Sequence, residues 1–411
     1  MQITKQKKQV VMLYGTSVVG LLVGVLVSVL NTRSLPPALY GDVRYVQNLI
    51  SFISSLLLLG FFTSGSRLLA LSKDEQNSRR IRGIMCVILG ITILILMASM
   101  SVLYLISLAK GQTNMSPLYL AAIPVCGNIV LLNYVNTTAQ GDNHIGRLSI
   151  ARLLPSTLYL AIAYVVYKYS GATPVKMLLL YNGLAVIVLA SVILSAKPSF
   201  KGLAASFRDL NEENKKYGFN VYLGGLVAVS TQYLAGIFLG KFCTDNANVG
   251  FYTLALTLAG PLAMLPGIIG TTYFKRFASQ NRIDKKIFLS SILLTLLSLL
   301  IFVVCIKYVV MFLYDDSYAV VSTFASYLAI GTCFHGFGDM LNRFLGAHGK
   351  GTYLRNGAIA CGICAVLGNV ILVYFWKING AIVTRIISSM VYLLFMVGYY
   401  LKFTKDAQKE I

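Results

Sequence analysis

Charged residues are scarce in this sequence. Only 12% of its 411 residues are Asp, Glu, Lys or Arg, whereas 57% are hydrophobic, and the mean hydropathy is +0.73. Soluble globular domains carry about 25% charged residues, so this composition excludes a soluble globule and predicts an integral membrane protein. The apolar runs are too long for outer-membrane barrel strands, which alternate over about 10 residues, and they therefore predict membrane-spanning helices.

A signal-peptide cleavage site is also lacking. Three lysines, Lys5, Lys7 and Lys8, precede an apolar run as they would in a secretory signal, but the run from Val10 to Leu30 is long enough to span a bilayer. No small-x-small motif follows it, so we expect a retained first helix. Hydropathy predicts twelve spans: 10–31, 40–69, 83–109, 116–138, 146–168, 174–195, 218–240, 248–274, 286–313, 320–346, 352–376 and 378–402.

The parts that an enzyme needs are missing as well. No cluster has metal-ligand spacing, no nucleophile has an evident base, and no insertion is large enough for a nucleotide-hydrolysing domain or for the outward loop of a sugar polymerase. Cys361 and Cys364 have redox spacing, but they lie in the middle of an apolar span and are interpreted as packing residues. We therefore predict no enzymatic activity, no metal and no cofactor.

Lysine and arginine are distributed unevenly between alternate loops. The N-terminus, the loops after even-numbered spans and the C-terminal tail hold 25 of them, whereas the opposite side holds eight. Because cytoplasmic loops are enriched in these residues, both termini are predicted to be cytoplasmic. The net charge of +21 then reflects topology and attraction to anionic lipid headgroups, and no nucleic acid partner is expected.

The longest and most charged connection divides the chain into halves. We predict an N-terminal lobe over residues 1–198, a cytoplasmic linker over 199–217 and a C-terminal lobe over 218–411. Because each half contains six spans, the halves would be parallel repeats related by an axis along the membrane normal. The predicted fold class is an all-α membrane protein with about twelve transmembrane helices in two six-helix lobes, with a substrate path between the lobes.

A faint internal repeat supports this division. A shift of 209 positions places Gly41 on Gly250 and Arg67 on Arg276, so that a glycine opens and an arginine closes the second helix of each half. Single matches of this kind arise by chance. The same order of an opening glycine and a closing arginine in both halves is stronger evidence for a repeat.

The charged side chains inside the predicted spans are mostly arginines. A charge at the centre of a membrane helix costs about 2.5–3.5 kcal/mol, so such residues normally face protein or water. The guanidinium fork of arginine suits phosphate and carboxylate groups, so this set favours an anionic passenger. The predicted substrate-binding residues are Arg44, Asn48, Arg152, Arg343 and Arg385.

These positions have alternative interpretations. Arg44 and Asn48 share a polar face of the second span. Arg385 lies seven residues into the last span, where it could instead snorkel to the membrane surface or form a structural ion pair. Arg152 lies near a cytoplasmic end, where its side chain could reach the membrane surface.

The tenth span carries a group of titratable residues. His335 and Asp339 are predicted to couple transport to a proton or ion, and Asp339 and Arg343, one helical turn apart, are expected to form an ion pair. A neutral pair that merely orients the helix is an equal alternative.

The segment Leu35–Val43, with the sequence LPPALYGDV, precedes a serine- and leucine-rich helix that ends in GFFTSGSR at Arg67. This arrangement resembles the first two helices of the polysaccharide transporter (O-antigen flippase) family, part of the multidrug/oligosaccharidyl-lipid/polysaccharide exporter superfamily. Length, span number and lobe layout extend the resemblance over nearly the whole chain, although the motif is confined to the first helical pair. Pro36 departs from the usual Leu-Gly-Pro.

The resemblance implies an exporter of the multidrug and toxin extrusion type in a bacterial cytoplasmic (inner) membrane. Its substrate would be an undecaprenyl-diphosphate-linked oligosaccharide repeat unit of O-antigen (lipopolysaccharide), capsule or exopolysaccharide, moved from the inner to the outer leaflet by alternating access. The implied partners are this lipid-linked oligosaccharide, membrane lipids and a polysaccharide polymerase. Outward movement of negative charge releases about 2.3 kcal/mol per charge per 100 mV, so the membrane potential would assist.

Two other functions stay open. An ion-coupled drug or small-molecule exporter of the same superfamily would need carboxylates for a cation, and spans 1, 7 and 8 have none in their interiors. A non-transporting membrane assembly partner would have no use for polar helix faces. A major-facilitator transporter is disfavoured because no Gly-x-x-x-Asp-Arg loop lies between residues 64 and 83.

Overall fold

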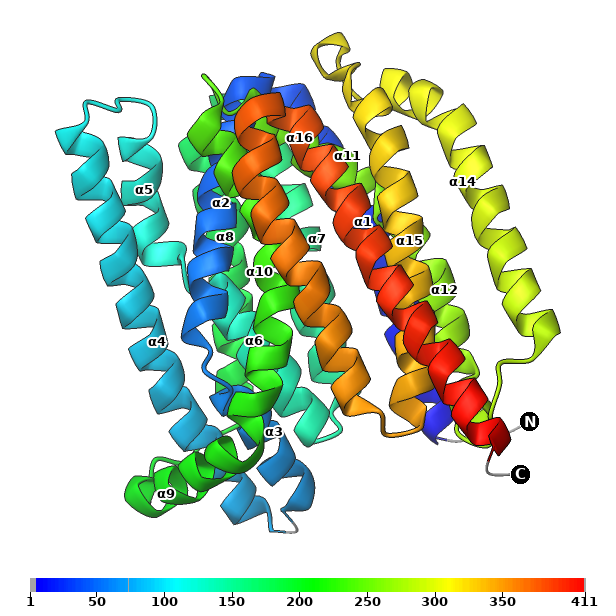
Figure 1. Ribbon diagram of the computed structural model, residues 1–411. Coiled ribbons are helices and arrows are strands. Elements are labelled where there is room, and N and C mark those ends of the chain that lie inside the picture. Colours follow the sequence, from blue (N-terminus) through cyan, green and yellow to red (C-terminus); the bar gives the residue numbers. More distant parts are fainter. Residues whose placement is uncertain (1–4, 73, 410–411) are drawn as a thin grey trace. The chain divides into compact units, whose positions relative to one another are not determined.

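Helices make up the regular structure of this chain, and the computed structural model describes residues 5–72 and 74–409 (Figure 1). No strand occurs among these residues, because a helix satisfies its own backbone hydrogen bonds within a bilayer. The helices are α1 (Lys5–Ser34), α2 (Pro37–Leu57), α3 (Phe61–Leu71), α4 (Glu75–Ala109), α5 (Ser116–Ala122), η1 (Ile123–Val125), α6 (Asn128–Gly141), α7 (Ile145–Ser170), α8 (Pro174–Ser195), α9 (Leu203–Glu213), η2 (Asn214–Gly218), α10 (Phe219–Phe242), α11 (Ala247–Ala259), α12 (Pro261–Thr272), α13 (Phe274–Phe277), α14 (Lys285–Leu313), η3 (Asp316–Tyr318), α15 (Val321–Ala347) and α16 (Gly351–Lys409).

Each of the twelve predicted spans coincides with a helix or with a pair of helices separated by a break. In the described part of the chain, nine helices are long and apolar enough to cross a membrane, or ten if the bent pair α2–α3 is one span. The longest, α16, is interrupted at Lys377, where φ is 48° and ψ is −126°. Figure 1 shows its two halves, orange and red, side by side, so α16 supplies spans 11 and 12. The chain is a multi-pass membrane protein.

The breaks within spans have local causes. Pro124 lies in the short η1 helix between α5 and α6, and Pro261 begins α12, whereas Pro266 lies inside α12 without ending it. The 60° bend between α2 and α3 has no proline. There Gly60 adopts a φ of 83°, and a Cβ atom at this position would lie 2.5 Å from the carbonyl of Gly218. Only glycine fits both the backbone angle and the close approach.

Contacts between Cα atoms divide the chain into two units. The N-unit comprises Met1–Leu35 and Val46–Leu226, and the C-unit comprises Pro36–Tyr45 and Val227–Ile411. The first turns of α2 therefore belong to the C-unit, although the rest of α2 belongs to the N-unit.

Polar contacts connect α1 with α7 in the N-unit. Thr16 Oγ1 donates to Ser149 Oγ over 3.0 Å, and the Tyr159 hydroxyl donates to Asn31 Oδ1. Hydrogen bonds between helices are expected in a bilayer, because lipid tails provide no alternative partners for buried polar groups.

The segment predicted as a linker contains a helix. α9 lies across the ends of α3 and α4 (Figure 1), and the following residue Asn214 donates through Nδ2 to Leu59 O and accepts from Ser64 Oγ. Arg67 adds an ion pair of 2.6 Å to Glu213. These contacts hold the connection against the bend between α2 and α3. Its packing against α3 was not predictable from hydropathy, because a short amphipathic helix resembles a polar loop in such a profile.

The C-unit is built around α15. This helix packs against α16, α12, α11 and α14, and Figure 1 shows α15 between α14 and the red half of α16. Near its C-terminal end, an apolar cluster includes Phe277, Met340, Phe344 and Met396, all fully buried. Tyr392, which belongs to the polar region described below, is also part of this cluster.

The glycines that open the second helix of each half meet within the C-unit. A Cβ atom on Gly250 of α11 would lie 3.3 Å from Gly41 Cα, and one on Gly41 would lie 1.8 Å from Asn246 O. Asn246 Nδ2 also donates to Asp42 Oδ1 over 2.7 Å. The two glycines matched by the 209-residue repeat thus allow the starts of α2 and α11 to touch.

Substitution of Gly41 by alanine should sharply reduce the amount of folded protein. The added methyl would overlap a backbone oxygen, which cannot move aside as a flexible side chain can, and overpacking costs about 1–3 kcal/mol or more. Membrane abundance, measured by size-exclusion chromatography of a fluorescent fusion, tests this expectation. Gly90→Ala is the matched control because no atom lies within 4 Å of its added Cβ. Equal abundance of the two variants would contradict the packing argument.

Candidate functional site

Two polar helix faces meet inside the C-unit. Thr332, His335, Asp339 and Asn342 follow one face of α15 at spacings of three, four and three residues. Arg385, Ser389 and Tyr392 follow one face of the second half of α16 at spacings of four and three. We call these seven residues the polar seam.

Two glycines on α15 bring the helices close together at the seam. A Cβ atom on Gly331 would lie 3.1 Å from Ile386 Cα, and one on Gly338 would lie 2.5 Å from the ring of Tyr392. Small residues at such contacts let membrane helices approach closely. At this contact the side chains of Thr332, Ser389 and Tyr392 are buried, and the other four residues of the seam are half-buried.

Tyr392 is the central hydrogen-bonding residue of the seam. Its hydroxyl donates to Asp339 Oδ1 over 3.1 Å and accepts a hydrogen bond of 3.0 Å from Asn342 Nδ2. Its ring stacks on the imidazole of His335, with centroids 4.9 Å apart and planes inclined by 29°. A change in the charge or position of Asp339 would therefore be transmitted to His335 through the side chain of Tyr392 alone.

Other atoms of the seam are buried without a hydrogen-bond partner. They are Thr332 Oγ1, His335 Nδ1, Arg385 Nε and Ser389 Oγ. Buried polar atoms nearly always have partners, and an unsatisfied one costs about 1–3 kcal/mol. Four such atoms on two facing helices indicate a site that can accept a polar or charged ligand.

The cation of the seam is Arg385. Its charge interacts electrostatically with His335 of α15, Tyr252 of α11 and Cys361 in the first half of α16. No ion pair of Arg385 occurs among the described residues, so its positive charge is available to an anion.

One predicted ion pair is wrong. Asp339 and Arg343 are not paired among the described residues, since Asp339 accepts from Tyr392 and Arg343 is exposed. The methylene carbons of Arg343 lie against Gly270 of α12, where an added Cβ would be 2.8 Å from Arg343 Cδ. One helical turn was the correct spacing for a pair, but the two side chains turn toward different neighbours.

The remaining predicted residues lie elsewhere. Arg44, in the C-unit part of α2, donates through Nε to the Tyr40 hydroxyl over 2.8 Å and lies 5.0 Å from the centre of that ring. Asn48 and Arg152 belong to the N-unit, where Arg152 is exposed and donates to Asn136 Oδ1 over 3.2 Å. Of the predicted set, the structure brings together His335, Asp339 and Arg385. The substrate-binding and coupling roles of all the predicted residues stay predictions.

Sequence reasoning missed Thr332 and Tyr252. Thr332 had a usable signal, because it lies three residues before His335 on the same helical face. Tyr252 had none, since its electrostatic interaction with Arg385 depends on how α11 packs.

Comparisons with known proteins agree with this architecture. A family model described as "Polysaccharide biosynthesis protein" matches residues 7–280. No curated protein sequence matches the chain. A solved structure of the lipid II flippase MurJ in an inward closed conformation is similar, with a TM-score of 0.72 and 12% identity over 97% of this chain and 90% of that one.

Exporter structures are similar to a comparable degree. An inward-facing multidrug resistance MATE family transporter of the MOP superfamily has a TM-score of 0.70 and 16% identity, covering 93% of this chain and 94% of that one. A MOP superfamily transporter from Pyrococcus furiosus Vc1, described as having reversed binding-pocket polarity, has a TM-score of 0.60 and 16% identity, covering 96% of each chain. At these identities the likeness shows a shared fold.

Proposed function

Because this chain belongs to the polysaccharide biosynthesis protein family, we propose that it is a flippase for an undecaprenyl-diphosphate-linked oligosaccharide. It would move the repeat unit of O-antigen, capsule or exopolysaccharide from the inner to the outer leaflet of a bacterial cytoplasmic membrane by alternating access. A polysaccharide polymerase would then use the translocated unit.

The polar seam is the observation that carries this proposal. Arg385 presents an unpartnered Nε within a membrane helix, and hydroxyl groups of Thr332 and Ser389 are also unsatisfied. A diphosphate offers several oxygen acceptors, and a guanidinium binds such oxygens with charge-assisted hydrogen bonds. In the proposed cycle Arg385 binds the diphosphate, and Arg44, Asn48, Arg152 and Arg343 contribute further contacts along the path.

His335 and Asp339 are proposed to couple transport to a proton or ion. An ionised Asp339 accepts the hydrogen bond of Tyr392, whereas a protonated Asp339 can donate, which would reverse the direction of hydrogen bonds through Tyr392. The outward movement of diphosphate charge is also favoured by an inside-negative potential, by about 2.3 kcal/mol per charge per 100 mV.

Reconstitution tests the proposed function directly. Purified protein in liposomes should move a fluorescently labelled undecaprenyl-diphosphate oligosaccharide between leaflets, measured as the fraction of label that becomes accessible to a membrane-impermeant quencher. Protein-free liposomes are the baseline, and a neutral undecaprenyl glycan without the diphosphate is the matched substrate control. Equal rates with and without protein would refute a flippase.

An ion-coupled small-molecule exporter is the second candidate, because an exporter fold is shared with the MATE family transporter. The same liposomes, loaded with a cationic dye under a proton or sodium gradient, separate the two functions. Dye movement without movement of the lipid-linked glycan would favour the exporter.

A further inference from the structure

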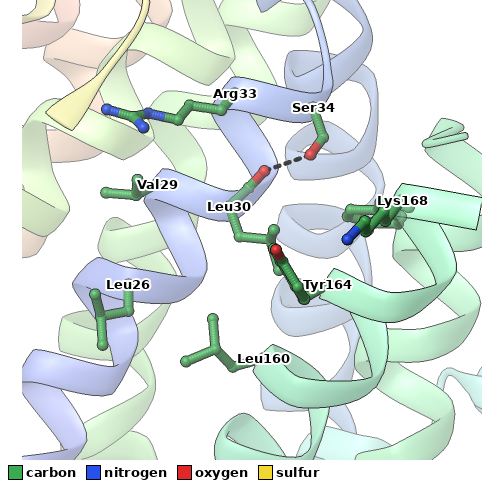
Figure 2. Close-up of a pocket in the computed structure, with 9 residues that line it drawn as sticks. Leu26, Val29, Leu30, Arg33, Ser34, Leu160, Tyr164 and Lys168 are labelled. Atoms are coloured by element: carbon green, nitrogen blue, oxygen red, sulfur yellow. Dashed lines mark hydrogen bonds between the residues drawn. The ribbon is translucent and has the colours of Figure 1, made fainter.

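A pocket lies between α1 and α7 in the N-unit (Figure 2). Its volume is about 450 Å³. Its lining comes from the last two turns of α1 and the last three turns of α7: Leu26, Val29, Leu30, Arg33, Ser34, Leu160, Tyr164, Tyr167 and Lys168.

The lining is apolar at one end and cationic at the other. Leu26, Leu30 and Leu160 form the apolar part, and Figure 2 shows Tyr164 next, with Lys168 beyond it toward the end of α7. Arg33 lies at the end of α1, and its guanidinium points away from Lys168. Lys168 is therefore the cation of the polar end, and none of the nine lining residues is a carboxylate, so this end favours an anion.

Buried hydrogen bonds hold the walls of the pocket at a fixed separation. The lining residue Tyr167 shares a hydrogen bond of 2.9 Å with the hydroxyl of Tyr159, which in turn donates to Asn31 Oδ1. Tyr159 and Asn31 are 0% exposed. Because this chain of bonds joins α7 to α1, the pocket is part of the folded N-unit.

Exposed apolar side chains flank the pocket on both helices. On α1, Val19 and Leu22 are exposed alongside the lining residue Leu26, and on α7, Ile162 and Val165 are exposed. Large exposed apolar side chains on membrane helices contact acyl chains. In the predicted orientation, the ends of α1 and α7 lie on the non-cytoplasmic side, so a lipid of the outer leaflet can enter the pocket from the bilayer.

We propose that this pocket binds an anionic phospholipid of the outer leaflet. Its phosphate lies against Lys168 and the Tyr164 hydroxyl, and one acyl chain lies along Leu26, Leu30 and Leu160. The dimensions of a spanning helix place Lys168 two turns beyond Leu160, so headgroup and chain are contacted in the order in which a lipid presents them. This inference does not depend on the transported substrate.

Lipid binding to the purified full-length protein tests the proposal. Native mass spectrometry with phosphatidylglycerol should give about fivefold weaker binding for Lys168→Ala, the loss expected for one lysine at a membrane surface. Lys110→Ala is the matched control, because Lys110 is also a lysine at the non-cytoplasmic end of a helix, α4, and does not line the pocket. Equal affinity of Lys168→Ala and Lys110→Ala would overturn the assignment.

Two further measurements separate a lipid site from other sites. Leu160→Trp, which keeps both cations but fills the apolar part, should also weaken phosphatidylglycerol binding, whereas a site for free phosphate would be unaffected. Millimolar inorganic phosphate should fail to displace the lipid. Displacement by phosphate, or equally tight binding of phosphatidylcholine, would overturn the proposal. Thermal unfolding of each variant verifies that the fold is retained.

Discussion

Replacement of Arg385 by alanine should slow translocation of the lipid-linked oligosaccharide by at least tenfold while leaving the protein folded. Arg385 Nε has no hydrogen-bond partner, and no ion pair is broken among the described residues, so the substitution orphans no carboxylate. Loss of hydrogen bonds to a charged group costs about 1.5–3 kcal/mol, which corresponds to a decrease of about 13- to 160-fold in the translocation rate. Fluorescence quenching in proteoliposomes measures this rate.

Two variants define the role of the Arg385 side chain. Arg385→Lys keeps the charge but loses the planar fork, so it should retain part of the activity if charge attracts the diphosphate and geometry orients it. Arg355→Ala is the matched control, since Arg355 is an exposed arginine in the first half of the same helix, α16. A wild-type translocation rate in Arg385→Ala would show that the polar seam is not part of the substrate path. Equal loss in Arg355→Ala would show that the effect is not specific to the seam.

Replacement of Arg82 by alanine should cause the largest loss of stability in the N-unit. The Arg82 side chain is 3% exposed, and it donates through Nε to Asp142 Oδ2 over 2.9 Å, while Asp142 is itself only 6% exposed. Its Nη1 donates to Glu75 Oε1 over 3.1 Å and to Ala196 O over 3.0 Å. Arg82 therefore joins α4 to the residues that follow α6 and α8. Removal of one member of a buried pair costs about 3–5 kcal/mol, because the other charge is left without a partner.

Unfolding of the purified protein in mixed micelles measures this loss. Arg79→Ala is the control, because Arg79 pairs with the same Glu75 at 3.4 Å but is 44% exposed, and such surface pairs contribute about 0–1 kcal/mol. The double variant Arg82→Met/Asp142→Leu should recover much of the stability, since it leaves no buried charge unpaired. Similar unfolding curves for Arg82→Ala and Arg79→Ala would contradict a structural role for the buried pair.

The contrast between these two arginines illustrates what the sequence can predict about charge. Arg82 was interpreted only as part of the cytoplasmic excess of lysine and arginine, and its position on α4 gave no sign of burial. Arg385 was singled out because a charge deep inside an apolar span is energetically costly, however that span packs against its neighbours. Depth along one helix is a local property of the sequence. Burial near a helix end depends on which other helices arrive there, and here Asp142 and Ala196 are 60 and 114 residues away.

The polar seam shows the same difference between local sequence and helix packing for single contacts. The sequence placed His335, Asp339 and Arg343 on one helix and predicted that the latter two would pair. Only packing decided that Asp339 bonds to Tyr392, which is 53 residues away, while Arg343 lies against Gly270. Two rotamers of a side chain can point to different neighbours at little cost, so the competing partner on an adjacent helix determines the outcome.

The sequence by itself determined the helical spans, their prolines and glycines, and the match of Gly41 with Gly250, because hydropathy and backbone constraints act within about 20 consecutive residues. The tertiary structure alone decided that these two glycines touch, that residues 203–213 form a helix across α3 and α4, and that four polar atoms of the seam have no partner. The physical reason is that lipid provides no hydrogen bonds and little preference among apolar faces. Contacts between distant helices therefore depend on the shapes and polar groups that packing brings together.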